Sequence, residues 1–103
     1  MSRIIFSKAY SSSPETPLQK LILLYLAMEC GESVCFSLSR EKLNMIAEFA
    51  VVELEEAELN IQRLKQLGYI IPTQAPYGNE KWWTFNFNAR AAVQIAAKES
   101  GNE

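Results

Sequence analysis

Four glutamates stand close together in the stretch VELEEAE, at Glu53, Glu55, Glu56 and Glu58. Neighbouring carboxylates are side chains that bind divalent cations or move protons in active sites, but either task needs further ligands and an enclosed pocket. The chain supplies none of the usual companions: it contains no histidine and no aspartate, no glycine-rich phosphate loop and no nucleophile next to a base. We therefore expect no enzymatic activity, no metal site and no cofactor.

Cys30 and Cys35 are the other residues with chemistry of their own. Two cysteines without a histidine cannot complete the four ligands of a tetrahedral zinc site, so we expect reduced thiols, which are usual in the cytoplasm. Arg3 is followed by only three apolar residues, too few for a secretory signal. The apolar run LILLYLAM at 21–28 is less than half of the roughly 20 residues that span a bilayer. We expect a cytoplasmic protein without membrane contact.

The overall charge argues against broad contact with nucleic acid. The chain of 103 residues carries 10 Lys and Arg and 12 Asp and Glu, a formal net charge of −2. Proteins held by phosphate contacts usually have a basic face instead. With 49% hydrophobic and 21% charged residues, the composition is that of one globular domain. We expect an N-terminal arm and linker over residues 1–15, a folded domain over 16–98 and a polar tail over 99–103.

The first clear helix signal lies at TPLQ. Thr16 is a suitable N-cap, Pro17 fits the first helical position and Gln19 completes a capping box. The helix is predicted to run to Gly31, a natural stop signal. Its apolar residues surround the whole circumference, which predicts a helix that is wrapped by other segments or shared with a second subunit. The preceding RIIF is predicted as a short strand or as an arm that packs on the body, followed by the polar linker SKAYSSSPE.

Short strands and helices alternate along the rest of the chain. The sequence predicts a strand at SVCF, a helix at REKLNMIAEF capped by Ser37 or Ser39, and a further helix that stops at Gly68. A strand at YII follows, ended by Pro72, and then a turn and a strand at KWWTFNF. Alternation in this strand places three aromatic residues on the core face, namely Trp83, Phe85 and Phe87. A last helix is predicted at ARAAVQIAAKES.

This order of elements resembles the winged helix-turn-helix family, as found in small bacterial, plasmid and phage regulators and replication initiators. LQKLILLYLA is similar to the family's first helix and SREKLNMIAEFAV to its second, while NIQRLKQLGYI is similar to the end of its recognition helix with the following strand. The resemblance covers about residues 17–87 and implies an α+β winged helix-turn-helix domain with a C-terminal helix. Two features depart from the family pattern. Val51 and Val52 stand where the turn usually has a glycine, and Glu53 replaces a serine or threonine cap.

Those departures leave a second architecture open. No glycine or proline lies between Gly31 and Gly68, so one continuous helix from Arg40 to Leu67 is compatible with the sequence. Seven residues fit a heptad seam along it: Leu43, Ala47, Ala50, Leu54, Ala57, Ile61 and Leu64. The fold would then be mainly helical with a β-hairpin, whereas the paired β-branched valines favour a break.

The resemblance places the acidic stretch at the exposed, groove-facing start of the recognition helix. DNA-binding relatives tend to carry polar or basic residues there, and carboxylates that face phosphate are repelled. The glutamates either complement the positive end of the helix dipole or form an acidic surface for a basic protein partner. The residues expected to contact DNA or that partner are Glu55, Glu56, Glu58, Leu59, Gln62, Arg63, Arg40, Lys42, Tyr77, Lys81 and Trp82.

Two functions follow from these observations. The first is a DNA-binding regulator or replication accessory protein of a bacterium or mobile element that binds double-stranded DNA, as the resemblance implies. The second is a protein-interaction module whose acidic helix binds a basic protein. In either case we expect a homodimer, unless the arm at 4–6 covers the surface concerned within one chain. Its interface would consist of Leu23, Leu26, Ala92, Val93 and Ala96.

Overall fold

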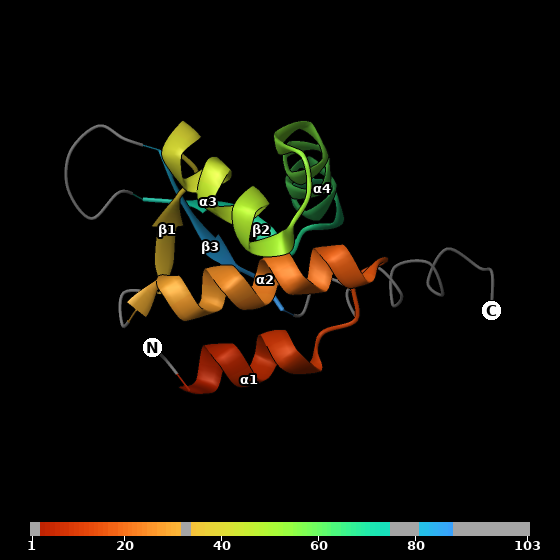
Figure 1. Ribbon diagram of the computed structural model, residues 1–103. Coiled ribbons are helices and arrows are strands. Elements are labelled where there is room, and N and C mark those ends of the chain that lie inside the picture. Colours follow the sequence, from red (N-terminus) through yellow and green to blue (C-terminus); the bar gives the residue numbers. More distant parts are fainter. Residues whose placement is uncertain (1–2, 32–33, 75–80, 88–103) are drawn as a thin grey trace, which may run out of the picture.

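Four helices and a three-stranded antiparallel sheet give the protein an α+β fold (Figure 1). The computed structural model describes residues 3–31, 34–74 and 81–87. In chain order the elements are α1 (Arg3–Ser11), α2 (Pro17–Glu29), β1 (Cys35–Ser37), α3 (Arg40–Ala50), α4 (Leu54–Leu67), β2 (Ile70–Thr73) and β3 (Trp82–Phe85). None of the helices in these ranges is long and apolar enough to cross a membrane. The helix predicted at ARAAVQIAAKES lies outside the described residues.

The N-terminal segment is a helix, so the prediction of a short strand there is wrong. Ile5 and Phe6 lie four and three positions before Ala9, so both side chains lie on the same side of the helix as Ala9. Ala9 is fully buried, and Ile5 and Phe6 pack against the same core. α1 thus lies along α2 as an arm that packs on the body (Figure 1), and it includes half of the predicted linker. It ends where the Ser12 hydroxyl donates to the Ala9 carbonyl at 2.6 Å.

α2 begins and ends at the predicted signals. The Thr16 hydroxyl accepts a hydrogen bond from the Gln19 amide at 3.2 Å, and Gly31 adopts the left-handed conformation after the last turn. The reciprocal bond of the capping box is shifted by one residue. The Gln19 side-chain oxygen accepts from the Glu15 amide at 2.9 Å rather than from that of Thr16. Gln19 is buried, and both polar atoms of its side-chain amide form hydrogen bonds, because the nitrogen donates to Asn60 on α4.

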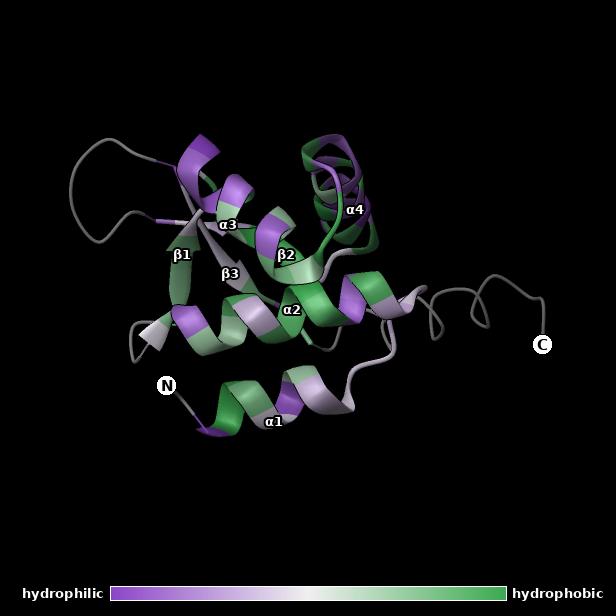
Figure 2. Cartoon of the chain, in the orientation of Figure 1, coloured by the Kyte–Doolittle hydropathy of each residue, from purple (hydrophilic) through white to green (hydrophobic). Residues whose placement is uncertain are grey.

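Opposite faces of α2 are both covered within one chain. Leu23 and Leu26 have no exposed surface, so the prediction that they form an exposed dimer interface is wrong. Their cover comes from α1 on one side and from α3 and α4 on the other (Figure 1). Figure 2 shows hydrophobic colouring along α2 and hydrophilic colouring at the start of α3. The remaining predicted interface residues, Ala92, Val93 and Ala96, lie outside the described residues.

A sharp turn separates α3 from α4, so the alternative of one continuous helix is wrong. Ser39 caps α3 by accepting from the Lys42 amide at 3.2 Å. α3 ends where Val51 adopts the left-handed conformation, with φ 59° and ψ 49°. The amide of Val52 donates to the Ala47 carbonyl at 3.0 Å, and that of Val51 donates to Glu48, which is the Schellman pattern. A β-branched residue is strained in this conformation, which glycine adopts without cost.

The sheet has the order β1–β3–β2, with β3 in the centre. Ile70 pairs with Phe85 and Pro72 with Trp83, so the prediction that Pro72 ends its strand is wrong. The Asn86 amide donates to the Tyr69 carbonyl at 2.9 Å, and hydrogen-bonded pairs alternate with non-bonded pairs along an antiparallel ladder. Pro72 therefore occupies a non-bonded position on an edge strand, where its missing N–H removes no bond to β3.

Candidate interaction surface around α4

α4 buries one face and presents its two flanks to different parts of the molecule. Ala57, Ile61 and Leu64 are spaced three and four residues apart and are buried in the core. One flank lies beside the start of α2, where Asn60 and Arg63 make their bonds. The opposite flank contributes Glu58, Gln62 and Lys65 to a depression shared with Leu38 and Leu43. Side chains that are neighbours in the sequence of α4 therefore lie either beside α2 or in the depression on the opposite flank.

On the α2 flank, Arg63 is held by Glu15. Its Nε donates to Oε1 and its Nη2 to Oε2, each at 2.7 Å, and Nη1 donates to Gln66 at 3.2 Å. The hydrogen bonds and charge of Glu15 raise the pKa of Arg63. The sequence predicts Arg63 as a contact to DNA or a partner. Its guanidinium instead joins α4 to the segment before α2.

On the opposite flank of α4, next to the sheet, the ammonium groups of two lysines lie over one indole ring. Lys65 Nζ lies 4.1 Å and Lys81 Nζ 4.9 Å from the ring centroid of Trp83. Together with Ser37 and Ser39 they line a depression of about 460 Å³. Burial lowers the pKa of Lys65, and the charge of Lys81 lowers it further. Within the described part of the chain, no carboxylate lies within 4.0 Å of either ammonium group. We call these five residues the lysine cleft.

The start of α3 lies at the edge of the lysine cleft. Ser39 is both a lining residue and the N-cap of α3, so the positive end of that helix points there. Arg40 follows as an exposed residue in the first turn. Lys42, which is also a predicted contact, lies toward α2 instead, with Nζ 4.0 Å from Glu29. Lys81 and Arg40 are thus the predicted cations at or beside the cleft, whereas Lys65 and Trp83 are not among the predicted contacts.

The signal that would have identified Lys65 is its helical spacing. Ile61 and Leu64 mark the buried face of α4, so Glu58, Gln62 and Lys65 must share the adjacent flank. That flank can be derived from the sequence once the limits of α4 are fixed. Trp83 is predicted to be a core residue and does pack against the core. The position of its ring beneath two lysine ammonium groups depends on residues from separate parts of the chain, so no local pattern in the sequence predicts it.

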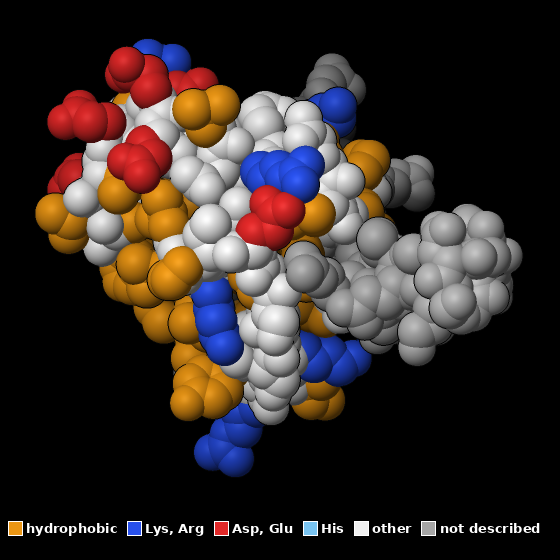
Figure 3. Space-filling view, turned by 90° about the vertical axis from the view of Figure 1, so that its right-hand side faces the viewer, with side chains coloured by type: hydrophobic (Ala, Val, Ile, Leu, Met, Phe, Trp, Pro, Cys, Tyr) orange, Lys and Arg blue, Asp and Glu red, His pale blue; other side chains and the backbone are white. Residues whose placement is uncertain are grey.

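The start of α4 is acidic and exposed. Glu55 and Glu56 are exposed and Glu58 is half-buried, while Leu59 has 71% of its surface exposed. Carboxylates gather at the upper left of Figure 3, with Lys and Arg side chains mostly elsewhere on that face. Of the Lys and Arg residues that the structure describes, none comes within 4.0 Å of these three glutamates. Since α4 begins here, the charges complement its dipole and leave the carboxylates available.

Of the two aromatic residues predicted as contacts, the structure describes Trp82. Trp82 is half-buried with its indole nitrogen enclosed, and its ring lines a depression that also contains Cys30 and Cys35. Part of the Trp82 side chain is exposed, and its role as a contact to DNA or a partner stays a prediction. Tyr77 lies outside the described residues. Both cysteines are thiols rather than disulfide partners, and burial raises the pKa of Cys30. Among residues 3–31, 34–74 and 81–87, no group of His, Cys, Asp or Glu side chains is arranged to hold a metal ion.

These features define an α+β domain with a helical turn, an acidic helix start and a separate basic cleft. In comparisons with known proteins, no family model, no curated protein and no solved structure matches the chain.

Proposed function

We propose that the chain is a winged helix-turn-helix domain that binds double-stranded DNA, as a regulator or replication accessory protein of a bacterium or mobile element. The order α2–β1–α3–α4–β2–β3 supports this proposal, because it is the order implied by the family resemblance. The left-handed turn at Val51 supports it as well, since it separates two helices where the family has its turn. In this proposal α4 is the recognition helix, and β2 and β3 are the strands of the wing.

The observation that carries the proposal is the pair of lysines at Trp83. Two ammonium groups close together repel each other, and partial burial of Lys65 adds a desolvation cost. An anion between them would offset both effects. The hydroxyls of Ser37 and Ser39 and the positive end of α3 are suited to the same ligand. A phosphate of the DNA backbone is the ligand that fits this combination.

The acidic start of α4 determines how DNA would be oriented. Glu55 and Glu56 repel phosphate, so the backbone would approach the flank that carries Gln62 and Lys65 and the first turn of α3. Arg40 and Lys81 then lie on the same side as the cleft. In this arrangement Glu58 lies close to the DNA, and a carboxylate there can accept a hydrogen bond from cytosine.

Fluorescence anisotropy with labelled duplexes tests the proposal. The wild-type chain should bind at low salt, and the logarithm of its affinity should fall linearly with the logarithm of the salt concentration. Lys65→Gln with Lys81→Gln should weaken binding and reduce the salt slope by about 0.9 for each phosphate that the variant no longer neutralises. Lys8→Gln, on the exposed side of α1, is the matched control and should bind as the wild type does. Absence of binding by the wild type at low salt, or equal affinity of the double variant, would contradict the proposal.

A protein-interaction module is the second candidate function. The exposed Glu55 and Glu56, with no cation within 4.0 Å in the described ranges, favour a basic protein as partner. If the wild type fails to bind any duplex at low salt while the fold is intact, this second function becomes the better account of α4.

A further inference from the structure

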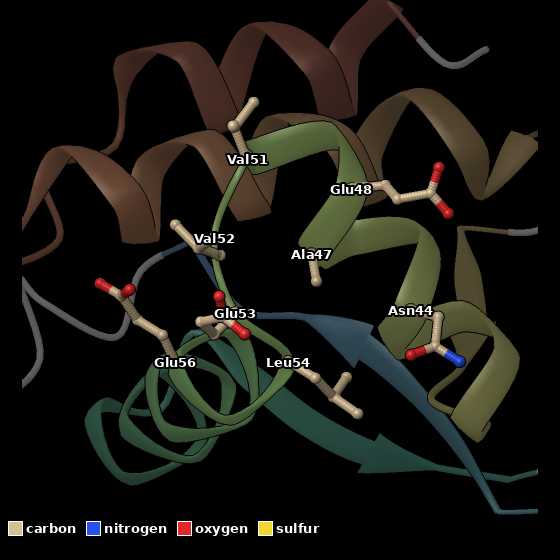
Figure 4. Close-up of a pocket in the computed structure, with 8 residues that line it drawn as sticks. All are labelled: Asn44, Ala47, Glu48, Val51, Val52, Glu53, Leu54 and Glu56. Carbon is tan, nitrogen blue, oxygen red and sulfur yellow. The ribbon is translucent and has the colours of Figure 1, made fainter.

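We propose that the turn between α3 and α4 docks a basic peptide segment of a partner protein, which places one aliphatic side chain between its cationic ones. The site is an open depression of about 760 Å³ at this turn, which we call the turn groove. It is lined by Asn44, Ala47, Glu48, Val51, Val52, Glu53, Leu54 and Glu56 (Figure 4). None of these residues belongs to the lysine cleft, so the proposal goes beyond DNA binding and does not depend on it.

The middle of the turn groove is apolar. Ala47 points from α3 toward the start of α4, where Leu54 extends beneath Asn44 (Figure 4). Val51, at the turn, has 88% of its surface exposed, and Val52 and Leu54 are half-buried. Apolar side chains that are exposed next to one another are typical of binding surfaces. The small side chain of Ala47 leaves room for an incoming aliphatic group.

The margin of the groove is negatively charged. Glu48 and Glu56 lie on different sides of the turn, with Glu53 between them (Figure 4). In the part of the chain that the structure describes, no Lys or Arg lies within 4.0 Å of these three carboxylates. A ligand with positive charges on both sides of an apolar centre would therefore be complementary to this surface.

Helix stability explains part of this charge and not the rest. Glu56 lies in the first turn of α4, where a carboxylate stabilises the positive helix end. Glu48 lies near the end of α3, where the dipole is negative and a carboxylate is unfavourable. The last turn of α3 contains no basic residue to compensate. Glu48 thus adds negative potential to the groove at a cost to its own helix, which a cationic ligand would offset.

The same charges identify the kind of occupant. Phosphate would be repelled by three carboxylates, so nucleic acid is excluded from the groove by electrostatics. Arginine or lysine side chains can each pair with one carboxylate, and charge-assisted hydrogen bonds to carboxylates are among the stronger ones. An aliphatic residue between them would cover Ala47 and Leu54. A short basic peptide with a leucine or valine at its centre meets both requirements.

The test is a titration of the ¹⁵N-labelled full chain with synthetic peptides, followed by amide shifts and calorimetry. The first peptide carries Arg-Ala-Leu-Ala-Arg at its centre, the second replaces Leu by Ser, and the third replaces both Arg by Glu. The first should bind with saturation and shift the amides of Asn44, Ala47, Val52 and Leu54. The second should bind at least tenfold more weakly, and the third should not bind.

Protein variants complete the test. Glu48→Gln with Glu53→Gln should weaken binding of the first peptide at least tenfold, whereas Glu41→Gln, an exposed acid at the start of α3, should leave it unchanged. Val51→Asn introduces a residue type that tolerates the left-handed conformation and should weaken binding by removing apolar surface that lines the groove at the turn. These variants should retain DNA affinity, so failure of this proposal can be distinguished from failure of the DNA-binding proposal.

Three results would overturn the proposal. One is equal affinity for the leucine and serine peptides, which would mean attraction by charge alone. Another is a set of shifts that avoids the turn groove. The third is a change of the groove amides with protein concentration in the absence of peptide, which would identify a second copy of the chain as the occupant.

Discussion

Arg63 on α4 and Glu15 before α2 form a two-point ion pair, with both donor–acceptor distances at 2.7 Å. The two residues are 48 positions apart in the sequence. Next to them, the buried Gln19 donates to Asn60 at 3.3 Å. These contacts join the segment between α1 and α2, and α2 itself, to the α2 flank of α4, so they help to set the orientation of the proposed recognition helix.

The first prediction concerns Arg63→Ala. We expect its DNA affinity to stay close to that of the wild type, because the guanidinium is engaged by Glu15 rather than presented to a ligand. Its melting temperature should be slightly lower, since an exposed ion pair contributes little and salt screens it. Thermal melts at low and high salt and anisotropy with one duplex measure both effects. A loss of affinity as large as that of Lys65→Gln would contradict this assignment.

The second prediction is that Val51→Gly stabilises the protein. Val51 has φ 59° and a β-branched side chain that is almost fully exposed, so its removal costs little packing. Relief of the left-handed strain should raise the free energy of unfolding by about 1 kcal/mol. Val52→Gly, at the next position, is the control and should destabilise, because Val52 packs against the core. Urea unfolding measures both changes, and a glycine variant at position 51 that is less stable than the wild type would refute the strain argument.

The third prediction concerns the start of α4. Glu53 occupies the N-cap with φ −68° and ψ 153°, but its side chain accepts no capping hydrogen bond. Glu53→Ser places a hydroxyl that can accept from an amide of the first turn, which should stabilise by about 1 kcal/mol. Glu53→Gln removes only the charge and serves as the comparison. If serine and glutamine give the same unfolding free energy, the cap is already satisfied in another way.

The fourth prediction is a loss of stability at high pH that depends on Tyr25. Burial, followed by the charges of Glu29 and Glu48, raises the pKa of Tyr25 above 10.0. The unfolded chain therefore loses this proton at a lower pH than the folded chain does. The resulting stability is present below pH 10.0 and is lost as the pH rises through the folded pKa.

Tyr25→Phe isolates this contribution. Its unfolding free energy should fall less steeply above pH 10.0 than that of the wild type, while the Tyr25–Phe49 ring contact at 4.8 Å is retained. Denaturation at a series of pH values gives the two slopes. Parallel slopes would show that Tyr25 ionises equally easily in both states.

The helix limits could be predicted from the sequence because they depend on local signals. Thr16, Ser39 and Gly68 cap or end their helices through bonds to residues three or four positions away, or through their own backbone conformation. The break at Val51 is predicted by paired β-branched residues and a family resemblance. Its competing alternative, one long helix, has equally good periodicity, so only the structure could decide between them.

The surface could not be predicted to the same extent, because it depends on contacts between distant segments. Arg63 is assigned to a ligand by the sequence because Glu15, its actual partner, lies in a supposed linker. Leu23 and Leu26 are assigned to a dimer because the segment covering them is predicted as an arm or strand rather than as α1. Lys65 on α4 and Lys81 just before β3 both lie over the ring of Trp83, and no local pattern in the sequence predicts this arrangement.

Pro72 has a further consequence for how the protein behaves at high concentration. β2 is an edge of the sheet, and an open edge is a template on which another chain can add a strand. The residue at the non-bonded position of β2 would offer its N–H outward to such a strand, and Pro72 has none. This interruption in the outward row of donors disfavours edge-to-edge growth and so protects the protein against aggregation through β2.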